Sequence, residues 1–256
     1  MIQQLVDRLA IRIHENRYLL GSDAVLMVTN RINNLLAEQE QINIIFASAP
    51  SQNEFLGFLK QETTIDWSRI NAFHMDEYIE LLENDSRTFA FFLHNKLFSI
   101  LPFRSVNYIN GNAPDIGAEC RRYAQLLVQF PPDIVCLGIG ENGHLAFNDP
   151  PVADFNDMAM VKMVKLDAAC RQQQVSDGCF SSLSDVPAYA ITLTIPALMS
   201  ARYIYGVVPG GNKAQAVYNT LTCDIIEKYP STILRTHPNT MLFLDKQSSS
   251  LLNDQI

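Results

Sequence analysis

Short apolar runs of strand length recur along this 256-residue chain and alternate with longer segments in which apolar residues have helical spacing. The run at 42–47 is followed by Ser-Ala-Pro-Ser, which predicts a strand buried on both faces that ends in a turn. Further strand candidates lie at 70–73, 134–139, 190–195, 203–208 and 240–244. Because strands separated by helices are joined by crossovers, the alternation predicts a mostly parallel sheet.

Apolar residues recur every three or four positions between these strands, which predicts helices that cover both faces of the sheet. The segments with this spacing are 22–36, 52–60, 87–100, 116–129 and 212–218. Leu5, Leu9 and Ile13 are also spaced like one face of a helix, so we expect a helix at the N-terminus. No repeat, low-complexity tract or Pro/Gly linker divides the chain, and we expect a single α/β domain over residues 1–256.

The charge balance excludes several classes of partner. Lys and Arg number 19 against 27 Asp and Glu, a formal net charge of −8, and the basic residues form no run. Without such a cluster nothing displaces phosphate counterions, so we expect neither nucleic acid nor an anionic membrane as a partner. No window approaches the ~20 apolar residues of a membrane span. The N-terminus lacks a basic start followed by an apolar stretch, which predicts a cytoplasmic protein.

The cysteines support the same compartment. The chain has five, an odd number, with no Cys-x-x-Cys pair among them. We therefore expect free thiols in a reducing cytoplasm, and neither a disulfide framework nor a zinc site.

Candidate chemistry lies directly after the strands, where ligands bind in parallel α/β sheets. The loop at 138–151 has three glycines in six positions, including Gly143, and presents Glu141, His144 and Asp149 together. A histidine beside carboxylates is suited to proton transfer near neutral pH. A glycine turn with a surface histidine explains the same residues, and both interpretations stay open from this loop alone.

A pair of carboxylates follows the strand at 70–73. Asp76 and Glu77 are adjacent there, and like charges are costly to hold together unless they are solvated or used. The position after a buried strand favours a functional site over an exposed turn.

Two further loops are candidates for binding an anion. Gly211 and Lys213 lie in a Gly-Gly turn that opens a predicted helix, where free N–H groups and a cation attract negative charge. Ser48 and Ser51 follow the strand at 42–47 and offer hydroxyls, although helix capping explains the serines equally well.

Together these segments resemble the glucosamine-6-phosphate deaminase family. The resemblance rests on Met-Asp-Glu-Tyr at 75–78, Ile-Asn-Gly-Asn-Ala-Pro-Asp at 109–115, and the segments 138–150 and 209–214, in the same order over nearly the whole chain. The related 6-phosphogluconolactonases share the glycine–histidine loop but continue it with Thr-Ala-Ser-Leu-Phe-Pro. Here it continues Leu-Ala-Phe-Asn-Asp-Pro, in the style of the deaminases.

The resemblance implies a Rossmann-like α/β fold and a reaction that uses neither a metal nor a redox cofactor. Glucosamine 6-phosphate would be converted to fructose 6-phosphate and ammonia. By motif position Asp76 would be the base that moves a proton from C2 to C1, and His144 would assist ring opening beside Asp149. Lys213 matches the phosphate-binding lysine, with Arg171 as the single arginine in the segment where the family has another.

The chain departs from the family at three places. Asn142 stands where many members have Asp, and Asp149 stands where they usually have Glu. An asparagine orients His144 by hydrogen bonding but adds no charge. In the first phosphate loop, Pro50 removes one potential N–H donor.

Three functions therefore compete. The first is isomerisation with deamination of an amino-sugar 6-phosphate, of gluco or galacto configuration. The second is hydrolysis of 6-phosphogluconolactone on the same fold, and the third is a sugar-phosphate-binding protein that has lost turnover. The partner in each is a small sugar phosphate, and the sequence leaves open whether the chain forms a homo-oligomer.

Overall fold

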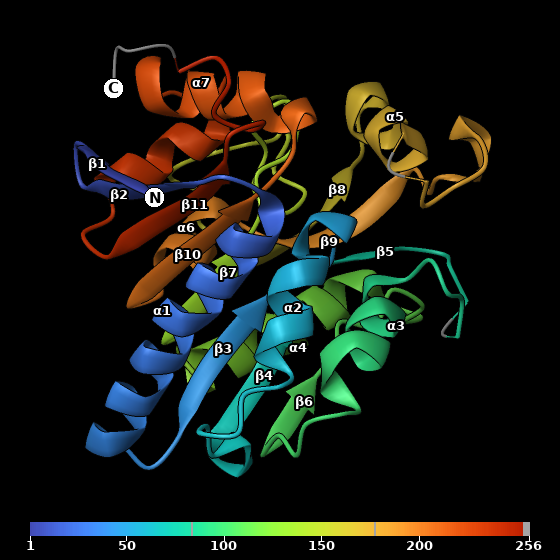
Figure 1. The fold of residues 1–256 in the computed structure, drawn as a ribbon. Coiled ribbons are helices and arrows are strands. Elements are labelled where there is room, and N and C mark those ends of the chain that lie inside the picture. The colour runs from blue at the N-terminus through green and yellow to red at the C-terminus, as the bar shows by residue number, and fades with distance from the viewer. Residues whose placement is uncertain (83, 177, 253–256) are drawn as a thin grey trace.

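An eight-stranded sheet runs through the centre of the computed structural model, which describes residues 1–82, 84–176 and 178–252 (Figure 1). Its strand order is β1-β2-β11-β10-β7-β3-β4-β6, and every neighbouring pair except β1–β2 is parallel. The strands are β1 (Ile2–Val6), β2 (Leu9–His14), β3 (Ile42–Phe46), β4 (Ile70–His74), β6 (Ser105–Asn107), β7 (Ile134–Leu137), β10 (Tyr203–Val208) and β11 (Thr240–Asp245). The mostly parallel α/β sheet expected from the sequence is confirmed.

Helices cover both faces of this sheet (Figure 1). They are α1 (Arg17–Glu38), α2 (Asn53–Leu59), α3 (Phe89–Leu93), α4 (Ile116–Gln129), α5 (Ala168–Ser176), α6 (Ile195–Met199) and α7 (Ala214–Thr222). One core packs α1 and α2 against one face, and a second packs α4, α6 and α7 against the other. Strand β3 shows the division, because Ile44 and Phe46 belong to the first core and Ile45 to the second. This is why the central strands are apolar on both sides.

The N-terminal helix expected from the sequence is wrong. Residues 2–14 form an antiparallel hairpin, β1–β2, that turns at Asp7, whose φ is +52°. A spacing of four residues fits a strand as well as a helix, because four is a multiple of the two-residue strand period. The buried apolar side chains are Leu9 and Ile11, a spacing of two, and β2 extends the main sheet by pairing with β11.

A separate three-stranded antiparallel sheet lies beside the carboxyl edge of the main one. Its order is β5 (Asp76–Tyr78), β9 (Tyr189–Leu193), β8 (Val161–Lys165). The strand expected at 190–195 is therefore present, but it belongs to this sheet. Residues 87–100 hold the short α3 followed by a π-helical turn, His94–Phe98, instead of one long helix.

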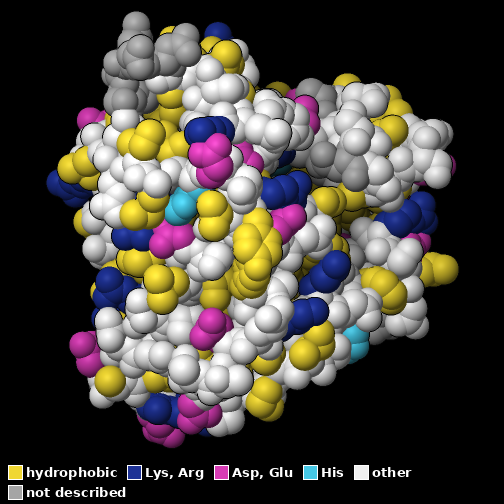
Figure 2. Space-filling model, in the orientation of Figure 1, with side chains coloured by type: hydrophobic (Ala, Val, Ile, Leu, Met, Phe, Trp, Pro, Cys, Tyr) yellow, Lys and Arg dark blue, Asp and Glu magenta, His cyan; other side chains and the backbone are white. Residues whose placement is uncertain are grey.

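Acidic and basic side chains are interspersed on the face of the molecule drawn in Figure 2. Among the described residues, no helix has both the length and the apolar character needed to cross a membrane.

A buried hydroxyl holds the end of β4 in place. The Tyr123 side chain, from α4, accepts from His74 N–H at 3.1 Å and lies within donating distance of the His74 and Asn107 carbonyl oxygens, at 2.9 and 3.1 Å. Asp76 follows this strand end by two residues. The position of Asp76 therefore depends on a polar link across the core.

We predict that Tyr123→Phe lowers the free energy of unfolding by about 1–3 kcal/mol, because it leaves buried backbone groups without their partner. Chemical denaturation of the variant measures this difference. Tyr189→Phe, at a side chain 41% exposed, is the control and should leave stability unchanged. Equal stability of the two variants would contradict the role of the Tyr123 hydroxyl.

Candidate active site

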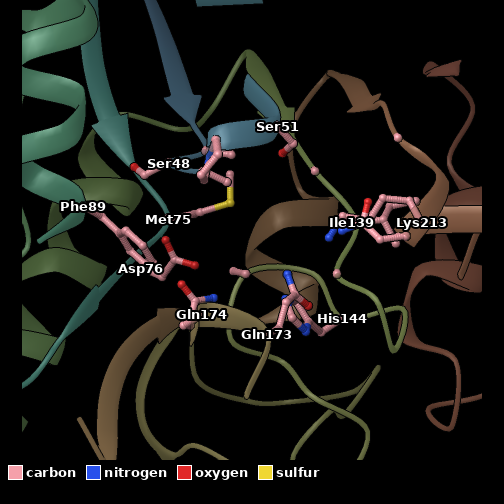
Figure 3. A pocket seen from close by; sticks show the side chains of 18 of the residues that line it. Ser48, Ser51, Met75, Asp76, Phe89, Ile139, His144, Gln173, Gln174 and Lys213 are labelled. Carbon is pink, nitrogen blue, oxygen red and sulfur yellow. The ribbon is translucent and has the colours of Figure 1, made fainter. Parts of the chain in front are cut away.

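Four loops that follow β4, β3, β7 and β10 line one cavity of about 190 Å³ at the carboxyl edge of the main sheet (Figure 3). These four strands are consecutive neighbours in the sheet. Helix α5 adds Gln173 and Gln174 to the lining. In the view of Figure 3, Asp76 and Gln174 lie toward one end of the cavity and Lys213 toward the other. The loops that the sequence singled out therefore meet in space, as a parallel sheet requires.

The glycines of the loop after β7 make room for His144. The Gly143 N–H donates to the Gly140 carbonyl at 2.9 Å, and Gly143 has a φ of +87°, which favours glycine. A Cβ atom added to Gly140 would lie 2.2–2.4 Å from the His144 ring. The ring thus occupies the space that any larger residue at position 140 would need.

His144 is oriented by two neighbours on its Nδ1 side. This atom lies 2.8 Å from Asn142 Oδ1 and 2.9 Å from Asp149 Oδ1, while Asn142 Nδ2 donates to Asp149 Oδ1 at 2.9 Å. Both neighbours of Nδ1 are oxygen acceptors, so Nδ1 carries the hydrogen of the neutral ring. Nε2 is then left to exchange a proton.

Asp149 remains ionised beneath the histidine. It is 2% exposed. Burial raises the pKa of its carboxyl group, but the hydrogen bond and charge of His144, with hydrogen bonds from Asn142 and Cys170, outweigh burial and lower this pKa overall. The Asp149 carboxylate therefore places a negative charge beside His144.

Asp76 and Glu77 lie in different surroundings despite being adjacent. Asp76 lines the cavity at 7% exposure, and burial, followed by the charge of Glu77, raises its pKa well above the ordinary value of 3.8. Glu77 accepts the N–H groups of Tyr78, Phe89 and Ala90 at 2.8–3.1 Å and so caps α3. Burial raises the Glu77 pKa to about 7 in spite of these bonds. Of the pair, Asp76 is the side chain that can reach a ligand.

The other end of the cavity is suited to an anion. Lys213 is buried to 6% exposure at the start of α7 and lines the cavity with Ser48 and Ser51. The Ser48 hydroxyl is buried and has no hydrogen-bond partner among the described residues. Arg17 also lines this part and pairs with Glu54 at 2.7 Å.

The remaining residues predicted from the sequence lie around the cavity. Glu141 is not against the histidine, because its carboxylate accepts from the Asn212 side chain at 2.8 Å. The Gly211 backbone lies in the Gly211–Lys213 turn beside the lining. Arg171 is not among the lining residues, and its guanidinium donates to the carbonyls of Leu183 and Val186 at 2.7 and 2.8 Å.

Sequence reasoning missed four polar residues of the lining: Arg17, Gln173, Gln174 and Asn212. Arg17 begins a helix that no candidate loop precedes, so its position after a hairpin gave no signal. The two glutamines, with Cys170, have the spacing i, i+3, i+4, which places all three on one face of α5. That spacing was a signal available in the sequence.

His144, Asp149 and Cys170 are the one group of three among the described residues whose donor atoms lie within 4.8 Å of one another and could hold a metal ion. Tetrahedral zinc keeps its ligand atoms about 3.3 Å apart, whereas His144 Nδ1 and Asp149 Oδ1 are 2.9 Å apart. The distance fits a hydrogen bond between them better than a shared ion.

The fold and the cavity define an α/β enzyme with a buried carboxylate, a histidine and a cation at the carboxyl edge of a parallel sheet. The family model for glucosamine-6-phosphate isomerases/6-phosphogluconolactonase matches residues 15–243. The chain belongs to this family, which confirms the resemblance seen in the sequence.

Relatives and solved structures agree with this assignment. A glucosamine-6-phosphate deaminase of Bacillus cereus (strain B4264) is 36% identical over 196 residues, covering 77% of this chain and 73% of the relative. The structure of a monomeric glucosamine-6-phosphate deaminase superposes with a TM-score of 0.86 at 28% identity, over 94% of this chain and 99% of that one. The 6-phosphogluconolactonase of Thermotoga maritima shares the fold, with a TM-score of 0.75 at 21% identity, over 93% of this chain and all (100%) of that one.

We predict that Lys213→Gln weakens the binding of inorganic phosphate by about tenfold or more, because it removes a buried cation from the anion end of the cavity. Thermal shift against phosphate concentration measures the affinity. Lys246→Gln, at a side chain 65% exposed, should bind like the wild type. If both variants keep wild-type affinity, the anion does not bind beside Lys213.

Proposed function

We propose that the chain converts an amino-sugar 6-phosphate, with glucosamine 6-phosphate as the first choice, and water to fructose 6-phosphate and ammonia. One observation carries the proposal: Asp76, His144 and Lys213 line the same cavity although they come from three separate loops. An aldose–ketose proton transfer needs a carboxylate, ring opening needs a group that exchanges protons near neutral pH, and the phosphate needs a cation. The deaminase relatives support this choice.

Ring opening falls to His144. Its Nδ1–H is held by Asn142 and Asp149, so Nε2 is the nitrogen that takes the proton of the C1 hydroxyl and gives it to the ring oxygen as the C1–O5 bond breaks. Asp149 stabilises the imidazole ring of His144 when that ring carries the extra proton. Lys213 fixes the phosphate at the other end of the sugar, which sets the position of C1 and C2 along the cavity.

The isomerisation falls to Asp76. Its carboxylate takes the proton from C2 while the aldehyde oxygen gains a proton, which gives an enolamine with a double bond between C1 and C2. The same carboxyl then returns the proton to C1 as the amino nitrogen loses one. The product is the imine of fructose 6-phosphate, and water adds to it and releases ammonia. A raised Asp76 pKa makes this carboxylate a stronger base than an exposed aspartate.

We predict that Asp76→Asn lowers kcat for ammonia release by about 10³-fold, within the range for loss of a general base, with a small change in KM. A coupled ammonia assay with glucosamine 6-phosphate and galactosamine 6-phosphate measures it. Asp66→Asn, at an exposed residue before the amino end of β4, is the matched control and should keep full activity.

The same preparations are assayed with 6-phosphogluconolactone. Lactone hydrolysis without ammonia release would contradict the proposal and favour a hydrolase on this fold. Binding of sugar phosphates without turnover of any of them would favour a binding protein.

We predict that Gly140→Ala lowers kcat by about 100-fold, because its Cβ displaces the His144 ring that acts as the proton donor. Circular dichroism checks that the variant folds. Gly57→Ala, where an added Cβ meets nothing within 4 Å, should retain activity. Full activity of Gly140→Ala would show that His144 is not needed in its present position.

We predict that kcat/KM falls as the pH drops through the Asp76 pKa, since the base must be ionised. This pKa is raised, so the acid limb lies clearly above pH 3.8. A pH–rate profile between pH 4 and pH 9 locates the limb. An acid limb at an ordinary aspartate value would mean that Asp76 is solvated in the free enzyme.

A further inference from the structure

Cys170 lies beneath the His144–Asp149 pair and plays no part in the reaction described above. Its Sγ atom, a nitrogen of His144 and a carboxylate oxygen of Asp149 lie within 4.8 Å of one another. Cys170 is 1% exposed, and its thiol lies close enough to the Asp149 carboxylate to act on it as a donor and help lower its pKa. We propose that Cys170 is a positioning residue, whose thiol holds the Asp149 carboxylate in the orientation that accepts the Nδ1–H of His144; the role in catalysis rests on the proposed function.

The start of α5 delivers this thiol to Asp149. Asp167 accepts the Cys170 N–H at 2.6 Å and so fixes the first turn of the helix. On the same face, Gln173 accepts the Glu141 N–H at 3.0 Å, and Gln174 lines the cavity. Helix α5 therefore contacts the histidine loop and its carboxylate through one stripe of side chains.

Asp149 has a particular need for such a donor. It is almost fully buried, and its Oδ1 atom already receives both the Asn142 side-chain N–H and the His144 contact. A carboxylate in this position must be held by several donors to stay charged and in one rotamer. Asn142 carries no charge, so a rotated Asp149 would leave His144 without its counter-ion.

The thiol is a permanent donor in these surroundings. The charged and titratable groups around Cys170 are His144, Asp149, Asp167, Asp76 and Tyr78. Burial, followed by the charge of Asp149, raises the pKa of the Cys170 thiol far above the ordinary range. Cys170 therefore stays protonated wherever the protein is folded, and it acts as a hydrogen-bond donor and not as a nucleophile.

Two substitutions separate hydrogen bonding from packing. Cys170→Val fills the site without a donor, whereas Cys170→Ser is smaller but keeps one. We expect kcat to fall about tenfold in Cys170→Val with KM within about twofold, and Cys170→Ser to keep most of the activity, since one hydrogen bond is at stake. Cys136→Val, at an equally buried cysteine in β7, is the control and should match the wild type. If Cys170→Val is as active as Cys170→Ser or more so, the residue acts by packing and the proposal is wrong.

A second measurement does not depend on turnover. The ring signals of His144 in the folded protein, assigned with His144→Asn, report the protonation of Asp149 as an inflection on the acid side. We expect this inflection to rise by about one pH unit in Cys170→Val and to stay in place in Cys170→Ser. An unchanged inflection in Cys170→Val would overturn the role of the thiol. If the wild type releases no ammonia from any hexosamine 6-phosphate, the proposed function fails, and the inflection still decides whether Cys170 positions Asp149.

Discussion

Four parallel strands that end at one edge of the sheet, β4, β3, β7 and β10, are the constraint on which the site depends. Because both faces of these strands are covered by helices, their side chains are mostly apolar, and the polar groups that line the cavity lie in the loops that follow them. Residues far apart in the chain, such as Ser48, Asp76, His144 and Lys213, are therefore brought to one cavity by backbone pairing alone.

The acidic residues of the site show how local surroundings give the same group different tasks. Asp76 is buried, and burial raises the pKa of its carboxyl group well above the ordinary value, which makes its carboxylate a stronger base. Glu77 caps the N-terminus of α3, and Asp149 is kept ionised by His144 and its other hydrogen-bond partners. The net charge of −8 does not argue against an anionic substrate, because in the proposed function the local field at the phosphate is set by Lys213 and nearby backbone N–H groups.

The sequence predicted the parallel sheet and the loops that line the cavity, since buried strands and the residues after them have strong local patterns. It failed where local patterns are ambiguous: Leu5, Leu9 and Ile13 fit both a helix and the hairpin that forms. It also failed where a role depends on distant packing. Arg171 is directed to backbone carbonyls, whereas Arg17, which begins a helix after the hairpin, lines the cavity. The direction in which a helical side chain points is set by its tertiary contacts, and the spacing of residues in the sequence does not reveal those contacts.

The most direct test of the account is the crystal structure of the protein with an open-chain amino-sugar 6-phosphate that lacks the carbonyl group. The account predicts that the phosphate contacts Lys213 and that the Asp76 carboxylate lies about 3–3.5 Å from C1 and C2, with His144 Nε2 beside the C5 hydroxyl. A ligand bound with its phosphate at the Asp76 end, or outside the cavity, would contradict the proposed roles of all three residues.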